Sequence, residues 1–329
     1  IGAGIVYYLV IQQGMVNRLI FFIVVSVLYS LFAIIRGIFF RQRQQEPGRP
    51  VNPAEEPYLW RLTQEVASLL QTRPIQSIYL TPGTEIAVFE KGSLIQKTRG
   101  QGKRALLLGL GVLEGLTQGQ LKSILAHEYG HFTAKDTAGG ELAYRVQRSM
   151  QVIAIGLASS GQARWYNPAW LFISGFYKLF LRITLGASRL QEILADRFSL
   201  AAYGARNFCD GMRHIVRQSI NFNTQFHIEV NQAIQQGLPL HNLYRLPLPS
   251  SGEDIHALEN AYQQVFNKPT GTYDSHPSPA ERCQMVEQLH LPEKFPGPDD
   301  DRPAWELFTK AEKWQSEMTA DVQSKLEIA

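Results

Sequence analysis

The chain has 329 residues, enough for one large or two modest domains, and 45% of them are apolar against 19% charged. The net charge of +3 is small and no basic stripe is interleaved with aromatic residues, so nothing indicates a nucleic-acid partner. The two cysteines, Cys209 and Cys283, are far apart and form no CxxC pattern, which argues against a disulfide scaffold or a cysteine zinc site.

The first 40 residues are almost entirely apolar, and "LIFFIVVSVLYSLFAII" (19–35) contains no charge. A helix over 19–40 would be about 33 Å long, enough to cross a bilayer. Residues 1–11 are expected to be the end of an earlier span, with a turn at 12–18, so 1–40 is predicted to be a transmembrane hairpin whose first helix is truncated. A buried core helix and a cleaved signal peptide are the alternatives.

The arginines around this segment predict its orientation. The turn carries Arg18 alone, whereas the exit carries Arg36, Arg41, Arg43 and Arg49. Because positive charge accumulates on the cytoplasmic side, we expect everything from residue 41 onward to be cytoplasmic. The predicted location is therefore an integral membrane protein, of a bacterial inner membrane, with a cytoplasmic catalytic domain.

A polar, proline-rich linker (41–57) separates this segment from a globular region (58–290), and a C-terminal linker and helix (291–329) follow. The pattern predicts an α+β fold that is mainly helical with a small sheet. The expected elements are a helix over 58–73, strands over 75–82 and 85–90, a buried strand starting at 104 that turns helical after Gly111, and helices from 190 interrupted at 237–254 and 268–281. Thr117 and Gln120 have the spacing of a capping box and predict a helix start.

The helix after this cap contains "LAHEYGH" (125–131). Residues four apart lie on one helical face, so His127 and His131 can present two imidazoles to one zinc ion. Glu128 can lie beside the metal without binding it, which suits a general base for zinc-bound water. Two hydrated surface histidines are the alternative reading.

A catalytic zinc site needs a third protein ligand, and "RLQEILADRFSLAAYGA" (189–205) contains Glu192 and Asp196 four residues apart. One of these carboxylates can bind zinc, and the other can hydrogen-bond a ligating histidine. A pair of surface carboxylates is the alternative. The small residues that follow favour close helix packing.

With these motifs the chain resembles the integral-membrane zinc metallopeptidases that include HtpX and the CAAX prenyl endopeptidases, over about residues 58–290. "LTQGQLKSILAHEYGHF" is similar to the active-site helix of that family, "EILADRFS" to its third-ligand helix and "SHPSPAER" (275–282) to its later His-Pro…Arg motif. The resemblance implies a zincin-like domain that binds one zinc ion and hydrolyses peptide bonds.

The resemblance also implies roles for individual residues. The zinc ligands would be His127, His131 and Glu192, the base would be Glu128, and Asp196 would orient one of the two histidines. His276 would lie near the zinc, either stabilising the oxyanion or closing the site as a reversible fourth ligand. Arg282 would anchor that segment by pairing with a carboxylate.

The strand before the active-site helix departs from the family pattern. The family usually has an Asn-Ala pair there, and this chain has Ile86-Ala87. We still expect substrate to pair with this edge strand, at Ile86, Ala87 and Val88.

An apolar insertion (148–188) separates the two ligand-bearing segments. Lys178 and Arg182 fall in the middle of its second apolar stretch, where each would cost about 2.5–3.5 kcal/mol at the centre of a lipid-facing helix. If one helix runs through, they continue the polar stripe of Glu192 and Asp196, and the other face carries Phe176, Leu179, Phe180 and Ile183. This face is expected either on the membrane surface or over the active-site cleft, or else in an ordinary core.

These observations favour a membrane-anchored zinc metalloendopeptidase, with a role in membrane-protein quality control suggested by analogy alone. The alternatives are a catalytically weak zinc-fold protein with a regulatory or binding role, and a structural membrane subunit. Glu128 favours the enzyme, because binding alone does not require a base. The expected partners are the bilayer, a protein or peptide substrate, and either a second copy of the chain or another membrane protein.

Overall fold

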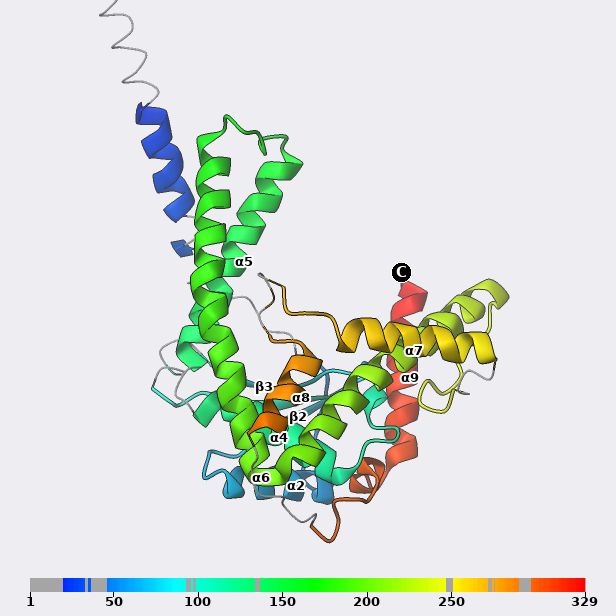
Figure 1. Ribbon diagram of the computed structural model, residues 1–329. Helices are drawn as coiled ribbons and strands as arrows, with labels where there is room; N and C mark the ends of the chain where they lie inside the picture. Colours follow the sequence, from blue (N-terminus) through cyan, green and yellow to red (C-terminus); the bar gives the residue numbers. More distant parts are fainter. Residues whose placement is uncertain are drawn as a thin grey trace, which may run out of the picture. The chain divides into compact units, whose positions relative to one another are not determined.

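The computed structural model describes residues 20–32, 35–36, 46–92, 96, 99–133, 137–246, 251–271, 274, 276–289 and 297–328. The chain divides into two compact units (Figure 1). One unit consists of Ile1–Arg43 and Ala138–Ala187, and the other of Gln44–Thr137 and Ser188–Ala329. Residues 1–19, which include the first predicted span and its turn, lie outside the described residues.

The second unit contains a four-stranded mixed sheet in the order β1-β2-β4-β3. β2 and β4 are parallel, whereas β1 pairs with β2 and β3 pairs with β4 in antiparallel fashion. The strands are β1 (Arg49–Val51), β2 (Ser77–Thr81), β3 (Ile86–Lys91) and β4 (Lys103–Gly109). The run of leucines in β4 is buried because this strand lies inside the sheet, and β3 lies at an edge. The predicted strands and the small sheet are confirmed.

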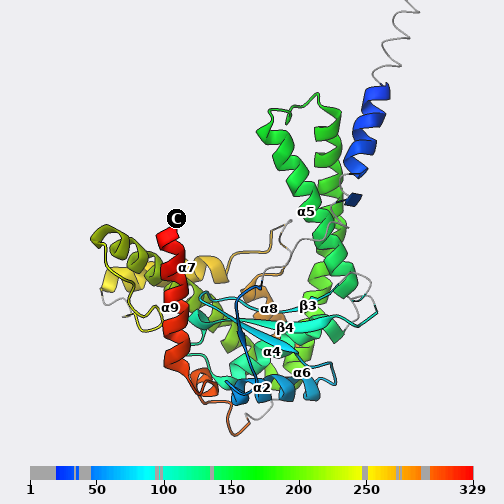
Figure 2. The same cartoon turned by 180° about the vertical axis from the view of Figure 1, so that it is seen from behind.

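Helices α2 (Pro57–Leu69) and α4 (Gln118–Thr133) pack together against the sheet, as Figure 2 shows. Their apolar stripes meet the strands in one core that contains Leu59, Val66, Leu106, Leu121 and Leu125. The predicted capping box is present at the start of α4. The Thr117 N–H donates to Gln120 Oε1 at 3.1 Å, and the Gln120 N–H donates to Thr117 Oγ1 at 3.3 Å.

One helix, α6 (Pro168–Gln236), runs from the insertion through the predicted third-ligand segment. Lys178 and Arg182 therefore lie on the same helix as Glu192 and Asp196, as predicted for one helix that runs through. A kink at Gly204, where φ is 81°, divides α6. An L-residue with a side chain rarely adopts that conformation, so the glycine permits the change of direction. After α6 come α7 (Gly252–Phe266) and α8 (Pro279–Gln288).

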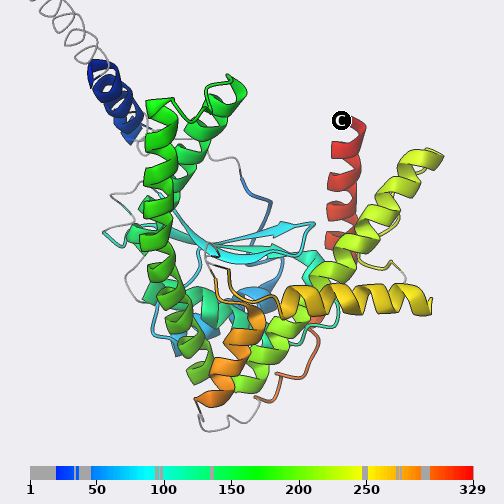
Figure 3. The same ribbon diagram turned by 45° about the horizontal axis from the view of Figure 1, so that its top comes forward.

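In the first unit, α5 (Thr137–Ser159) and the beginning of α6 form a helical hairpin, visible in Figure 3. The hairpin encloses a small core around Met150 and Ile173. The apolar face predicted for α6 is divided between two environments. Phe176 and Phe180 pack against this core, whereas Leu179 and Ile183 are exposed.

Apolar exposure is pronounced in the first unit. Trp165, in the turn of the hairpin, is 82% exposed, and most apolar side chains of the helix over Ile20–Phe32 are exposed. Among the described residues, one helix, Pro168–Gln236, is long and apolar enough to cross a membrane by length and composition.

The C-terminal segment packs into the main core of the second unit. Helix α9 (Ala311–Ile328) buries Trp314, Met318 and Val322 among residues of α2, α4 and the sheet. The C-terminal helix is therefore docked on the domain. A short 3-10 turn, η2 (Ala304–Leu307), leads into it.

Candidate active site

The first two predicted ligands come from the last two turns of α4. His127 and His131 direct their Nε2 atoms toward each other at 3.3 Å. Two ring nitrogens at this distance can both bind one ion placed between them, which is the arrangement that the i, i+4 spacing predicts. The His127 side chain is 12% exposed and the His131 side chain 28%, so the location is largely shielded from solvent.

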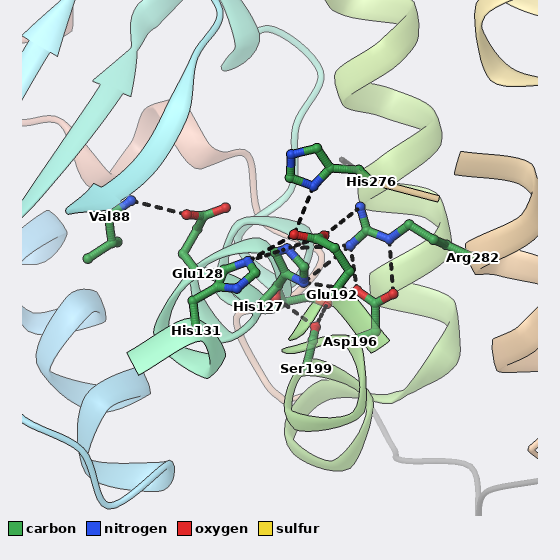
Figure 4. Close-up of polar contacts among 10 residues, drawn as sticks. Val88, His127, Glu128, His131, Glu192, Asp196, Ser199, His276 and Arg282 are labelled. Atoms are coloured by element: carbon green, nitrogen blue, oxygen red, sulfur yellow. Dashed lines mark hydrogen bonds and ion pairs between the residues drawn. The ribbon is translucent and has the colours of Figure 1, made fainter. Parts of the chain in front are cut away.

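Helix α6 brings Glu192 to the same point, as Figure 4 shows. Its Oε2 lies 3.5 Å from His127 Nε2, and its Oε1 lies 3.4 Å from His131 Nε2. Ligand atoms about 2.0–2.2 Å from a tetrahedral zinc ion lie about 3.3–3.6 Å from one another. The two histidine nitrogens have this spacing, and with one donor atom from each side chain all three atoms lie within 4.8 Å of one another, close enough to converge on one metal ion. Within the described part of the chain the three residues form a group of histidine and carboxylate side chains suited to a metal ion.

The chemistry of these donors also fits a metal ion. Glu192 Oε2 is buried and has no hydrogen-bond partner in the structure, although such atoms are normally paired. Burial, together with the neighbouring His127, lowers the pKa of His131 to about 4, so its imidazole is neutral at physiological pH and can donate a lone pair. Burial alone would raise the pKa of Glu192, but the hydrogen bond from His276 and the nearby His127 and Arg282 side chains outweigh it and lower that pKa.

Asp196 and Arg282 orient His127 from the Nδ1 side of its ring. Asp196 Oδ1 lies 2.9 Å from His127 Nδ1, which favours the tautomer that leaves Nε2 free for a metal. Arg282, from α8, pairs with both carboxylate oxygens of Asp196. The residue spacing left open which carboxylate would face the metal, the family resemblance implied Glu192, and neither said which histidine Asp196 would orient. The structure places Glu192 between the two Nε2 atoms and Asp196 at His127.

The Glu128 side chain reaches the edge strand β3. Its Oε2 accepts a hydrogen bond of 3.1 Å from the Val88 N–H (Figure 4). Burial raises the pKa of Glu128, although His127 and the Val88 N–H reduce the effect. A carboxylate with a raised pKa takes a proton from water more readily, which is what a general base requires.

His276 reaches the site from the segment between α7 and α8. Its Nδ1 lies 2.8 Å from Glu192 Oε1, while 63% of its side chain is exposed. The hydrogen bond to Glu192 raises the pKa of His276. The structure thus brings all the predicted polar residues together, and of the predicted edge-strand residues Val88 contacts them directly.

The sequence analysis missed the contacts that hold α4 and α6 at ligand distance. Ser123 and Ser199, both fully buried, hydrogen-bond through their hydroxyls at 2.7 Å. A Cβ atom on Gly130 would lie 2.8 Å from the Cα of Ala195, so the glycine allows the two helices to touch. The available signal was the placement of small residues, Gly130 inside "HEYGH" and Ala195 between Glu192 and Asp196.

Replacing Gly130 with alanine is expected to destabilise the protein by about 1–3 kcal/mol, because the added methyl group pushes α6 away from α4. In an unobstructed helix the same change stabilises by about 1 kcal/mol. Chemical denaturation and metal titration would measure both effects, with weaker metal binding expected. Gly175→Ala is the matched control, since a Cβ there meets nothing within 4 Å. Equal behaviour of the two variants would contradict the close-contact explanation.

A small mixed sheet with an edge strand beside an HExxH helix, completed by a glutamate from a second helix, defines a metal-dependent peptidase of the zincin type. The comparisons with known proteins agree with this class. The family model "Peptidase family M48" matches residues 66–290. The chain belongs to peptidase family M48. It is therefore a metalloprotease, a hydrolase of peptide bonds.

Individual relatives show the same relationship. The chain is 25% identical to a "Protease HtpX homolog" of Acaryochloris marina over 241 residues, which are 68% of this chain and 79% of the relative. It is 30% identical to a "Protease HtpX homolog" of Aquifex aeolicus over 106 residues, 32% of this chain and 33% of the relative. The crystal structure of S. mikatae Ste24p is 14% identical with a TM-score of 0.35, and the match covers 80% of this chain and 56% of that one. The family and the two HtpX homologues support a membrane metalloprotease.

Proposed function

We propose that the protein is a membrane-anchored zinc endopeptidase in which His127, His131 and Glu192 bind the metal and Glu128 is the general base. The observation that carries this proposal is the convergence of one donor atom from each of the three side chains within 4.8 Å, with a base on the residue after His127. Zinc bound there would supply Lewis-acid polarisation and lower the pKa of water to about 7.

The surrounding residues have separate tasks in this proposal. Glu128 takes the proton of the attacking water and passes it to the leaving amine. Asp196 orients His127, and Arg282 holds Asp196 in place. The exposed imidazole of His276 lies where it can donate to the oxygen of the substrate carbonyl as negative charge develops there. The substrate chain would pair with β3 along Ile86, Ala87 and Val88 as an added strand.

The apolar helices support attachment to a membrane. The helix over Ile20–Phe32 and the outer positions Leu179 and Ile183 of α6 expose apolar side chains that water solvates poorly. Arg36, Arg41, Arg43 and Arg49 follow the apolar segment 19–35, which supports a cytoplasmic location for the catalytic unit. A peptidase attached in this way would act on membrane proteins and their neighbours, and removal of damaged membrane proteins is a matching role.

Metal removal tests the proposal. The full chain, purified in detergent, is expected to contain about one zinc ion and to cleave unfolded casein. A chelator should abolish cleavage, and one equivalent of zinc should restore it, whereas magnesium should not, because the donor set is rich in nitrogen. Cleavage that persists after the metal has been removed would contradict the proposal, as would a purified protein that binds no zinc.

A further inference from the structure

The segment that carries His276 connects α7 to α8, and we call residues 267–278 the strap. Within the strap, the Gly271 N–H donates to Asp274 Oδ2 at 2.8 Å and the Asp274 N–H donates to the Gly271 carbonyl at 3.2 Å, which closes a tight turn. Thr270 also bonds the Glu281 carboxylate at the start of α8. These contacts hold Gly271 and Asp274, and Asp274 lies two residues before His276.

Arg189, on α6, hydrogen-bonds to this turn. Its Nη2 donates to the Gly271 carbonyl at 2.6 Å and to the Asp274 carbonyl at 3.3 Å, and its Nε donates to the Asp274 carbonyl at 3.3 Å. Hydrogen bonds from a charged donor are stronger than those between neutral groups. A guanidinium that donates to two carbonyls of one turn fixes both the position and the orientation of that turn.

Arg189 precedes Glu192 by three residues on the same helix, so the strap meets α6 at two points one turn apart. The first point is the grip of Arg189 on the turn, and the second is the contact of 2.8 Å between His276 and Glu192. Because 63% of the His276 side chain is exposed, packing alone does not hold the imidazole. Its location depends on the backbone that Arg189 anchors.

We infer that Arg189 is a positioning residue that acts through His276, by anchoring the strap so that the imidazole stays beside the metal ligands. This inference rests on the proposed function. It predicts that removing the guanidinium lowers turnover without removing the metal or weakening substrate pairing at β3, because the three proposed metal ligands and β3 all lie outside the strap.

The test compares kcat and KM for casein-derived peptides in the variants Arg189→Gln, His276→Ala and the double variant. His276→Ala should lower kcat about 100-fold, the scale of a lost oxyanion donor, and Arg189→Gln about 10- to 100-fold, both with KM nearly unchanged. The double variant should be no slower than His276→Ala alone, because residues that act through one another are not additive. Arg189→Lys, which can still donate to the carbonyls, should recover part of the loss.

Arg197→Gln is the matched control, since Arg197 is exposed about two turns further along α6, and it should leave the kinetics unchanged. Zinc content and melting temperature confirm that each variant is folded and loaded. Losses of Arg189→Gln and His276→Ala that multiply would overturn the inference, and so would wild-type kcat in Arg189→Gln. If Arg189→Gln does not fold, the other two variants decide. The inference is then overturned if Arg189→Lys and His276→Ala both keep the kcat of the wild-type protein. These results leave the zinc-dependent peptidase activity with Glu128 as base intact, and that proposal fails instead if wild-type protein shows no zinc-dependent cleavage.

Discussion

A Glu128→Gln variant is expected to bind zinc like the parent protein and to cleave peptide bonds about 10²–10⁴-fold more slowly. Glutamine has the shape of glutamate, and its Oε1 can still accept the hydrogen bond from the Val88 N–H. The fold and the three metal-binding side chains therefore remain. The amide cannot take a proton from water, so the loss falls on the chemical step.

The measurement pairs zinc analysis with steady-state cleavage of casein. Glu259→Gln is the control, because this partly exposed carboxylate on α7 pairs with Arg217 and has no contact with the site. The control should match the parent protein in both assays. A Glu128→Gln protein that keeps more than a tenth of the activity would exclude Glu128 as the base, and loss of zinc would show that its role is in metal binding.

The largest effect on stability is expected from Glu56→Gln, at about 2–5 kcal/mol of the free energy of unfolding. Glu56 is fully buried just before α2. Its carboxylate accepts hydrogen bonds from the Thr309 and Lys310 N–H groups and, at 2.6 Å, from Trp314 Nε1. An amide in this position turns an NH₂ group toward buried N–H donors, which then have no acceptor.

Urea denaturation in detergent would measure the loss, and limited proteolysis would detect release of α9. Glu55→Gln is the control. Glu55 is the adjacent residue but faces solvent more, and its ion pair with Lys313 spans 3.8 Å, so a change below about 1 kcal/mol is expected. Trp314→Phe removes one of the donors and should reduce the additional cost of Glu56→Gln. Equal stabilities of the two glutamine variants would contradict the role of Glu56 as the anchor of α9.

Local patterns predicted much of the fold correctly. The two central strands, the capping box of Thr117 and Gln120, and the helices on either side of 237–254 are present because each depends on nearby residues. The insertion was harder to predict. Its apolar face on α6 is divided between the hairpin core and an exposed surface, and a helical wheel cannot distinguish these environments because it contains no information about neighbouring helices.

The sequence by itself determined that His127 and His131 share a face and that Glu128 lies beside them, because the geometry of one α-helix imposes both. It also determined that Glu192 and Asp196 share a face of a later helix. Helix geometry alone did not decide which carboxylate meets both imidazoles: the family resemblance implied Glu192, and the tertiary structure, in which Gly130 lets α4 approach α6 at Ala195, places Glu192 there. The grip of Arg189 on the strap and the anchoring of α9 by Glu56 likewise join residues 82 and 253 positions apart, whose contacts no local pattern encodes.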